Sequence, residues 1–358
     1  MADTLTLQAA PLTAAIRAIV KAGGSNDREA DLVSTNLVEA NLKGHDSHGV
    51  GMIPRYIDSI KEGGLAVNAH VSITLDSNAL LTLDGNKAYG QVAGYEAIEL
   101  AAERAKRHGV CVLGLSNAHH VGRIGHWAEQ AIGHGLVSIH FVNVISRPVV
   151  APWGGSDARH GTNPFCVGIP RPGKDPIVLD FATSRIAQGK TRVAYNKGEQ
   201  LAPGILIDTQ GNPTTDPRFS VLEPLGAILP FGEHKGSGLA LICELLGGAL
   251  TGGKTAHERS DGQRRVLNGM FSILVDPTKL GTAENLAREM EEYVAWHTAS
   301  PKNPQTEKLM IAGEPERRYK AQRLVDGIPV DPTTWKEIIG AGAKVGLAQS
   351  DVERTAGI

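Results

Sequence analysis

Strand-like and helix-like hydrophobic patterns alternate through the middle of this 358-residue chain, whereas both ends have helical patterns. Strands are predicted at 71–75, 80–83, 110–115, 136–142, 165–169, 177–181 and 270–275. Helices are predicted at 91–108, 124–134, 183–196, 238–250, 284–297, 315–325 and from 334 onward, with a loop at 203–220. This order predicts a mixed α/β fold. One interpretation is a helical domain built from both termini that packs on a central sheet domain.

The charge balance gives no reason to expect a nucleic acid or an anionic membrane as a partner. Lys and Arg number 36 against 38 Asp and Glu, so the net charge is −2. The most apolar stretch, 239–250, contains Glu244 and is shorter than the roughly 18 residues that a membrane span requires. The N-terminal residues lack the pattern of a secretory leader.

The three cysteines, Cys111, Cys166 and Cys243, are odd in number, widely spaced and set in apolar surroundings. This pattern is typical of reduced core residues and not of a disulfide scaffold. The sequence therefore predicts a cytoplasmic protein.

A first polar motif, His45-Asp-Ser-His48-Gly49, follows a predicted helix. That helix begins at the capping box Asn26-Asp-Arg-Glu29, and Gly44 ends it. The motif has three interpretations: an acid/base histidine, a metal-binding His-x-x-His pair, or a solvated loop. Zinc requires three or four ligands, and no Cys or His partner of fitting spacing stands out.

A second motif, His119-His120-Val-Gly122-Arg123-Ile-Gly125-His126, lies where a predicted strand leads into a helix. Glycines at such a junction allow backbone N–H groups to face an anionic ligand, and Arg123 can add a bidentate donor. A plain strand–helix turn with surface histidines is the alternative.

Polar clusters also lie at the ends of two later strands, at Gly161-Thr162-Asn163-Pro164 and at Leu179-Asp180-Phe-Ala-Thr183-Ser184. Strand ends are where α/β proteins place their sites, and Asp180 could hold a histidine in one tautomer. Each cluster taken singly is equally well explained as caps and turns.

The segment Gly232-Glu-His-Lys235-Gly236-Ser-Gly238 offers a lysine and free amides at a predicted helix start, which suits a phosphate. It is neither a P-loop nor a Rossmann fingerprint, because Leu241 stands where glycine or alanine belongs. A dinucleotide, if bound, is therefore bound by another fold. No nucleophile elbow is present, which disfavours acyl transfer.

Six motifs in order make the chain resemble the type-2 malate/L-lactate dehydrogenase family over nearly its whole length. They are Gly44-His-Asp-Ser-His48-Gly49, Ser116-Asn-Ala-His-His120-Val-Gly122, Gly161-Thr-Asn-Pro164, Leu179-Asp-Phe-Ala-Thr183, Lys235-Gly-Ser-Gly238 and Gly313-Glu-Pro-Glu316. The last alone is explained equally well by the preference for proline at a helix start. Each motif is weak singly, but the ordered set is specific.

The resemblance implies a non-Rossmann fold with a largely antiparallel sheet and a helical domain formed by both termini. It implies domains at 1–75 together with 315–358 and at 76–314, and a homodimer. The implied activity interconverts a 2-hydroxy acid and a 2-oxo acid with NAD, or with NADP as the alternative, and without a metal.

The resemblance also assigns site residues by their place in the motifs. Catalytic roles fall on His48, as the acid/base, and on Ser47, Asp180 and His120. Cofactor contacts fall on His48, Gly122, Arg123, Ile124, Leu179, Asp180, Phe181, Ala182, Thr183, Lys235, Asn268, Gly313, Glu314, Pro315 and Glu316.

One position departs from the family pattern, because Met52 stands where many members carry an arginine suited to a substrate carboxylate. A thioether cannot form the bidentate bond that arginine forms. Thr162, Asn163, Arg123 or His120 would then hold the carboxylate. Met52 also makes the pocket more apolar, which favours bulky or aromatic 2-oxo acids over malate.

Three rival functions stay open at this point. The same scaffold could reduce cyclic imines with NAD(P)H. The histidines could serve a metal-dependent lyase or hydrolase. A catalytically silent nucleotide-binding protein is the third alternative.

Overall fold

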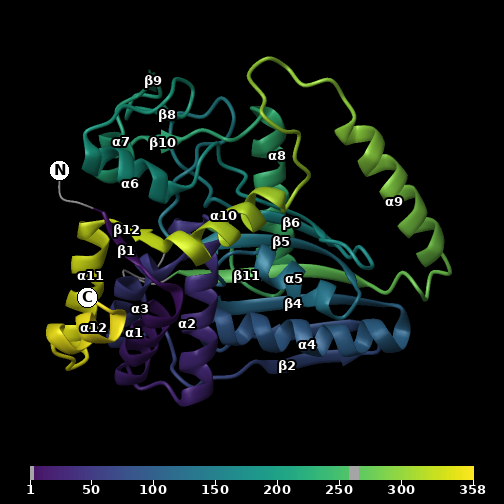
Figure 1. Cartoon of the computed structure of the whole chain (residues 1–358), viewed down its shortest axis with the longest axis horizontal. Coiled ribbons are helices and arrows are strands. Elements are labelled where there is room, and N and C mark those ends of the chain that lie inside the picture. Colours follow the sequence, from purple (N-terminus) through teal and green to yellow (C-terminus); the bar gives the residue numbers. More distant parts are fainter. Residues whose placement is uncertain (1–3, 258–265) are drawn as a thin grey trace.

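The computed structural model describes residues 4–257 and 266–358, so the predicted domain ranges 1–75 and 76–314 each include residues outside this description. Its centre is a seven-stranded sheet in the order β2-β3-β4-β11-β5-β6-β7 (Figure 1). The strands are β2 Ser72–Ser77, β3 Leu80–Asp84, β4 Val110–His119, β5 Val137–Ile145, β6 Phe165–Ile169, β7 Ile177–Phe181 and β11 Leu267–Val275. Within it β3 and β4 are parallel, and the other neighbours are antiparallel. The predicted largely antiparallel, non-Rossmann sheet is therefore confirmed.

The two faces of the sheet are covered differently. Helices α4 (Gly90–His108) and α5 (Gly125–Gly133) cover one face, where Leu113, Leu274 and Cys166 are buried. A row of phenylalanines, which we call the phenylalanine ladder, crosses the other face and ends beyond β7. Its neighbouring ring centroids lie 5.0–6.2 Å apart, and its members are Phe271, Phe141, Phe165, Phe181 and Phe231. These rings are only partly buried.

Both ends of the chain build the helical part of the molecule. Helices α1 (Ala9–Ala22), α2 (Asp27–Leu42) and α3 (Ile53–Lys61) share one apolar core with α11 (Pro332–Lys344) and α12 (Gln349–Ala356). Strand β1 (Leu5–Leu7) pairs with β12 (Ile328–Val330), which ties the two ends together. This confirms the helical part formed by both termini. The exact domain bounds stay a prediction, and β2 extends across the predicted boundary at 75.

The start of α2 forms only one of the two hydrogen bonds that the predicted capping box implies. The Asn26 side chain accepts a hydrogen bond from the Glu29 backbone N–H, which satisfies a free donor of the first turn. The Glu29 carboxylate does not return the bond, because it is buried and binds the Ser25 hydroxyl and the Asn68 amide. Gly44 ends the helix with φ +80°, as the sequence predicts.

Two predictions differ from the structure in the middle of the chain. The segment 203–220, predicted as a loop, contains the short strands β8 (Leu206–Ile207) and β9 (Pro213–Thr214) and helix α7 (Arg218–Val221). Together with β10 (Ala227–Ile228) the two strands form a small sheet that carries α6 (Gln188–Lys197). Strands of two residues carry too little periodicity to be recognised in a sequence.

The helix predicted at 238–250 begins earlier. Helix α8 spans His234–Cys243 and continues as a π-helical segment, η3, over Glu244–Leu250. Lys235 therefore lies in the first turn and not before it. The glycines at 236 and 238 hide this start, because they lower helix propensity.

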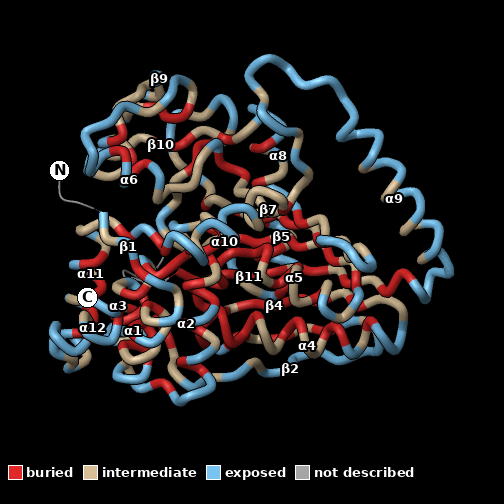
Figure 2. The backbone as a smooth tube through the Cα atoms, viewed as in Figure 1, coloured by how far each residue is buried: buried red, intermediate tan, exposed pale blue. Residues whose placement is uncertain are grey.

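Helix α9 (Ala283–Thr298) extends away from the rest of the molecule, and none of its residues is buried (Figures 1 and 2). The chain then returns to α10 (Glu314–Asp326), which lies across the helical part and the sheet. Among the described residues no helix is long and apolar enough to cross a bilayer. The three cysteines are buried and free.

Candidate active site

Two histidines from distant parts of the chain form a hydrogen-bonded pair. His48 ends a short 3-10 helix, η1 (Asp46–His48), and His120 directly follows β4. Nδ1 of His48 lies 3.2 Å from Nε2 of His120, and the rings are nearly parallel at 7°. His120 is buried, whereas His48 is partly exposed. His48 is therefore the member of the pair that a substrate can reach.

Tyr56 and Gln91 extend this pair into the protein, and the sequence prediction missed both. The Tyr56 hydroxyl, on α3, lies 2.8 Å from Nδ1 of His120, and Nε2 of Gln91, on α4, donates to it at 2.9 Å. Both side chains are almost fully buried. The available signal was a glutamine within an otherwise apolar helix start, Tyr89-Gly-Gln-Val-Ala93.

The histidines are held neutral. Burial lowers the pKa of His48 to about 4, and the charges of His45 and Arg123 add to the effect. Burial also lowers the pKa of His120 well below its usual value and that of His119 to about 3. A neutral imidazole at pH 7 is able to accept a proton.

The loop that carries His48 is fixed by α2 and α10. The Asn41 side chain accepts from the Val50 amide at 2.8 Å and donates to Asp46 at 2.7 Å. Arg323 of α10 forms a 2.7 Å ion pair with the same Asp46 carboxylate. These bonds hold the predicted His45–Gly49 motif in one conformation.

Ser47 faces helix α6. A Cβ atom added at Gly189 would lie 2.8 Å from the Ser47 Cβ, so only glycine allows this approach. The small sheet and α6 therefore close one side of the predicted catalytic loop.

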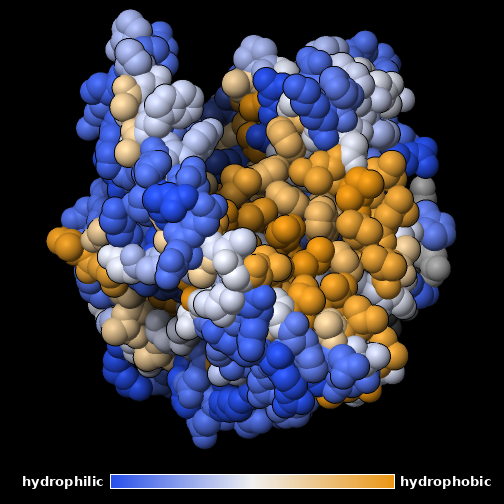
Figure 3. All heavy atoms as spheres, turned by 90° about the vertical axis from the view of Figure 1, so that its right-hand side faces the viewer, coloured by the Kyte–Doolittle hydropathy of each residue, from blue (hydrophilic) through white to orange (hydrophobic). Residues whose placement is uncertain are grey.

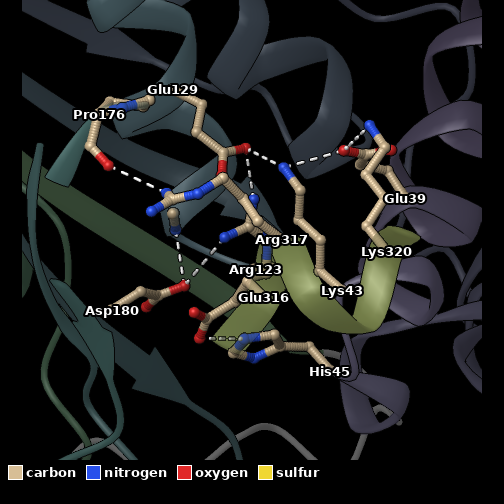
Figure 4. Close-up of polar contacts among 11 residues, drawn as sticks. Glu39, Lys43, His45, Arg123, Glu129, Pro176, Asp180, Glu316, Arg317 and Lys320 are labelled. Atoms are coloured by element: carbon tan, nitrogen blue, oxygen red, sulfur yellow. Dashed lines mark hydrogen bonds and ion pairs between the residues drawn. The ribbon is translucent and has the colours of Figure 1, made fainter. Parts of the chain in front are cut away.

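Arg123 lies at the centre of a charged network that Figure 4 shows. Its Nη2 lies 2.5 Å from the Glu129 carboxylate, which in turn binds Lys43 at 2.6 Å. Lys43 continues to Glu39, which also binds Lys320 of α10. The network joins α2, α5 and α10 around the loop that follows β4.

Asp180, at the end of β7, closes this network on the sheet side. It accepts from the Gly125 amide at 2.7 Å and lies 3.8 Å from Nη1 of Arg123. It thus contacts an arginine and a helix start, and not a histidine as the sequence hypothesis suggested. Burial raises the pKa of Asp180, although the Arg123 charge opposes this.

Glu316 brings the start of α10 to the catalytic loop. Its Oε1 lies 3.3 Å from Nε2 of His45, and its buried Oε2 has no hydrogen-bond partner among the residues that the structure describes. Burial acts to raise the pKa of Glu316, but the bond from His45 and nearby positive charge lower it overall. The Val178 amide donates to Ala312, which places Gly313 beside β7.

Contacts also place several of the remaining predicted cofactor residues. The Asn268 side chain accepts from the Val121 amide at 3.0 Å, directly after His120. Thr183 follows β7, and its carbonyl accepts from the Phe231 amide, four residues before Lys235. Leu179 is exposed, and Phe181 belongs to the phenylalanine ladder.

The predicted substrate residues have other contacts. Asn163 is fully buried, and its Nδ2 donates to Glu244 of η3 at 2.6 Å. The Thr162 carbonyl accepts from Thr183. Within 4–257 and 266–358 neither residue hydrogen-bonds to His48 or His120. Met52 is partly exposed and packs against the helical core. Substrate roles for these residues stay predictions.

One feature of the site, an unpaired carboxylate oxygen, fits a nicotinamide cofactor. The unpaired Oε2 of Glu316 is a buried acceptor in need of an N–H or O–H donor, and both a carboxamide and a ribose supply one. His45 and Arg123, the groups that influence its pKa, also act on His48. An open depression of about 770 Å³ is lined by Glu314, Arg317, Arg171 and Lys174, but not by the histidines.

The described part of the chain contains no group of three or more His, Cys, Asp or Glu side chains arranged to hold a metal ion. The metal-binding interpretation of the His45–Gly49 motif therefore has no support from geometry in those residues.

Comparisons with known proteins show the family to which the chain belongs. Residues 7–339 match the malate/L-lactate dehydrogenase family. Hydroxycarboxylate dehydrogenase B of Escherichia coli K12 is 45% identical over 340 residues, 94% of each chain. Within the family, the sequences of segments 119–130 and 233–235 predict a particular likeness to hydroxycarboxylate dehydrogenase B, and this comparison confirms it. A solved structure from E. coli, described as a putative malate/lactate dehydrogenase, is 44% identical with a TM-score of 0.94 and 98% of both chains covered.

A more distant solved structure bears on the range of chemistry. The delta1-piperideine-2-carboxylate reductase of Pseudomonas syringae is 31% identical with a TM-score of 0.82, covering 94% of this chain and 100% of that one. The fold described here is thus shared with a protein whose name states an imine substrate.

Substituting Arg123→Met tests the charged network. Arg123 is 2% exposed, so its loss leaves the Asp180 carboxylate without its arginine partner, whereas Glu129 keeps its bond to Lys43. We expect the free energy of unfolding, measured in urea, to fall by about 3–5 kcal/mol. The matched control is Arg288→Met, because Arg288 pairs with Glu289 on the surface of α9. An equal effect in both variants would contradict the assignment.

Proposed function

Because the chain belongs to the malate/L-lactate dehydrogenase family, we propose that it is an oxidoreductase that interconverts 2-oxo acids and 2-hydroxy acids with a nicotinamide cofactor. His48 is the general acid/base. The observation that carries the proposal is the pairing of a partly exposed, neutral His48 with the buried His120.

A nicotinamide, when bound, would supply or accept the hydride that C2 of the substrate gains or loses. The protein positions the reacting atoms, excludes water and moves one proton. In oxidation the neutral His48 ring accepts the hydroxyl proton. In reduction a protonated His48 donates to the developing alkoxide, and the ring then returns to its neutral form.

The cofactor-binding residues are those named above from the loop after β4, the end of β7, the starts of α8 and α10, and Asn268. NAD is the proposed cofactor, with NADP as the alternative. The free, buried cysteines support a cytoplasmic location.

A cyclic imine reductase is the alternative function, and the likeness to the piperideine-carboxylate reductase favours it over the other rivals. A cyclic imine and a 2-oxo acid both accept a hydride at a carbon next to a carboxylate. Assaying both substrate types with either reduced nicotinamide separates the two functions. A metal-dependent lyase or hydrolase gains no support from the described residues.

We further propose a homodimer formed through the face of the sheet that carries the phenylalanine ladder. The phenylalanine ladder is only partly covered, and exposed apolar side chains lie nearby on β3, α8 and η3, among them Leu80, Leu241 and Leu245. Figure 3 shows a broad apolar surface on the side that is at the right in Figure 1. Monomeric proteins rarely expose such surfaces, and a second copy of the chain is the commonest partner.

The first prediction from the proposed function concerns His48. We expect His48→Gln to lower kcat by about 10²–10⁴-fold, the usual contribution of a general acid/base. The free energy of unfolding should change little, because His48 as a residue is only partly buried and glutamine keeps a polar side chain there. His257→Gln, on an exposed histidine, is the matched control. A fully active His48 variant would refute the assignment.

The second prediction concerns substrate range. With Met52 in place of arginine, phenylpyruvate should be reduced faster than oxaloacetate, because the pocket offers apolar contact and one cation fewer. Met52→Arg should shift the ratio of the two kcat/KM values toward oxaloacetate. The assay follows reduced-nicotinamide absorbance with both cofactors. A clear preference of the unmodified protein for oxaloacetate would end the hypothesis.

The third prediction concerns assembly. Sedimentation velocity should give the mass of a dimer for the unmodified chain. Leu80→Lys, on β3, should shift the population toward monomer, since a buried ammonium group is costly. Leu324→Lys, on α10, carries the same change at a similarly exposed residue and should leave the dimer intact. A monomer in the unmodified protein would contradict the proposal.

A further inference from the structure

Glu244 is a buried carboxylate that connects two buried asparagines. It interrupts the apolar stretch 239–250 and lies in η3, where it is only 6% exposed. Its Oε2 accepts from Nδ2 of Asn163 at 2.6 Å, and its Oε1 accepts from the Ala256 amide at 2.5 Å. Nδ2 of Asn143 lies 3.5 Å from the same Oε1. A buried carboxylate is costly unless such donors satisfy it, so the loss of one partner leaves the others unpaired.

The orientation of each asparagine amide is fixed by a backbone partner. Oδ1 of Asn163 accepts from the Val144 amide at 3.1 Å. Oδ1 of Asn143 accepts from the Gly269 amide at 2.8 Å. Because a backbone N–H can only donate, the accepting atom is the oxygen in both side chains. Each asparagine therefore presents its NH2 group to Glu244.

One branch leads from Glu244 to the backbone beside His120. The Asn143 carbonyl accepts from Nδ2 of Asn268 at 2.8 Å, and Oδ1 of Asn268 accepts from the Val121 amide at 3.0 Å. Both asparagines are almost fully buried. Val121 directly follows His120, so this branch restrains the backbone that carries the buried histidine.

The other branch leads from Glu244 to the segment after β7. The carbonyl of Asn163 accepts from the Thr183 hydroxyl at 3.0 Å, and the carbonyl of Thr162 accepts from the Thr183 amide at 2.9 Å. Thr183 is fully buried and belongs to the segment that we propose as a cofactor contact. Glu244 thus lies where the two branches meet.

The packing of η3 on the sheet allows this connection. Strands β4, β5 and β7 end, and β6 and β11 begin, at the same edge of the sheet. A Cβ atom added at Gly248 would lie 2.5 Å from Nδ2 of Asn143, and one added at Gly247 would lie 2.7 Å from the Asn143 backbone nitrogen. Only glycine allows η3 to approach β5 so closely. The backbone of η3 therefore contacts the strand directly and holds Glu244 at this edge.

We propose that Glu244 is a positioning residue that fixes the backbone beside His120 relative to the Thr183 segment. The proposal deepens the proposed function and rests on it, because hydride transfer requires the proton carrier and the cofactor to share one geometry. It assigns a role to a charged residue in an apolar helix that no sequence motif singled out. His120 acts on the reaction through His48, and Thr183 through the cofactor.

The test is Glu244→Gln in the full chain. Glutamine keeps the shape but has one acceptor oxygen, and its NH2 group would face an N–H donor. We expect amide hydrogen exchange, measured by NMR without cofactor, to become about tenfold faster at Val121 and Thr183, as for the loss of one buried hydrogen bond. Exchange at Ile16, in the core of the helical part, should change much less. Unchanged exchange at Val121 and Thr183, or an equal increase at Ile16, would overturn the proposal.

Glu29→Gln is the matched control. Glu29 is also a buried carboxylate, and it accepts from the Ser25 hydroxyl and the Asn68 amide in the helical part. Its replacement should speed exchange at Asn68 and leave Val121 and Thr183 unchanged. An equal effect of Glu29→Gln at Val121 and Thr183 would show that Glu244 acts only through general stability, which would also overturn the proposal.

The unmodified protein gives a test that does not depend on a variant that folds. The amides of Ala256, Val144 and Val121, which the connected side chains bind, should be as well protected from exchange as Leu274 in the middle of β11. Fast exchange at these three amides would overturn the proposal.

Kinetics supply a further readout. Glu244→Gln should lower kcat by about 10- to 100-fold, the cost of a small misplacement of reacting groups, with the KM for the 2-oxo acid little changed. The Kd of NADH should rise about tenfold. A raised KM with unchanged kcat and Kd would contradict the proposal. The exchange measurements need no turnover, so failure of the proposed function would remain distinguishable from failure of this inference.

Discussion

The hydrogen bond between His48 and His120 is the contact on which the rest of the site depends. It joins the helical part of the molecule to the sheet, because one ring comes from a loop after α2 and the other follows β4. Burial removes the charge from both rings, so the bond is one between neutral groups. A neutral imidazole in such a pair is able to accept a proton from a bound molecule at neutral pH.

Contacts from β11 and α10 hold the histidine pair at the junction between the helical part of the molecule and the sheet. Strand β11 pairs with both β4 and β5, and its Asn268 fixes the backbone directly after His120. Helix α10 reaches the catalytic loop through Glu316 and Arg323. The site therefore combines residues spread from 39 to 323, and the C-terminal part of the chain supplies two contacts to its catalytic loop.

Much of the fold could be predicted because its signals are local. The cap at Asn26, the glycine at 44 and the strands 165–169 and 177–181 all occur as the sequence indicates. The partners of the histidines could not be predicted, because Tyr56 and Gln91 reach His120 only through tertiary packing. The sequence marks Asp180 as a polar residue at the end of a strand. Its partner, the Gly125 amide, could not be predicted, because that contact depends on how α5 packs beside β7. Short strands such as β8 and the early start of α8 carry too weak a local signal.

A crystal structure of the ternary complex with a nicotinamide cofactor and oxamate, a non-reacting analogue of a 2-oxo acid, tests the central claim most directly. The account predicts that a ring nitrogen of His48 lies within about 2.6–3.2 Å of the oxamate oxygen that replaces the ketone. It also predicts that the nicotinamide ring stacks over the carbon bearing that oxygen, with Glu316 and Asp180 at its border. A cofactor bound elsewhere, or a His48 ring that turns away from the inhibitor into solvent, would contradict it.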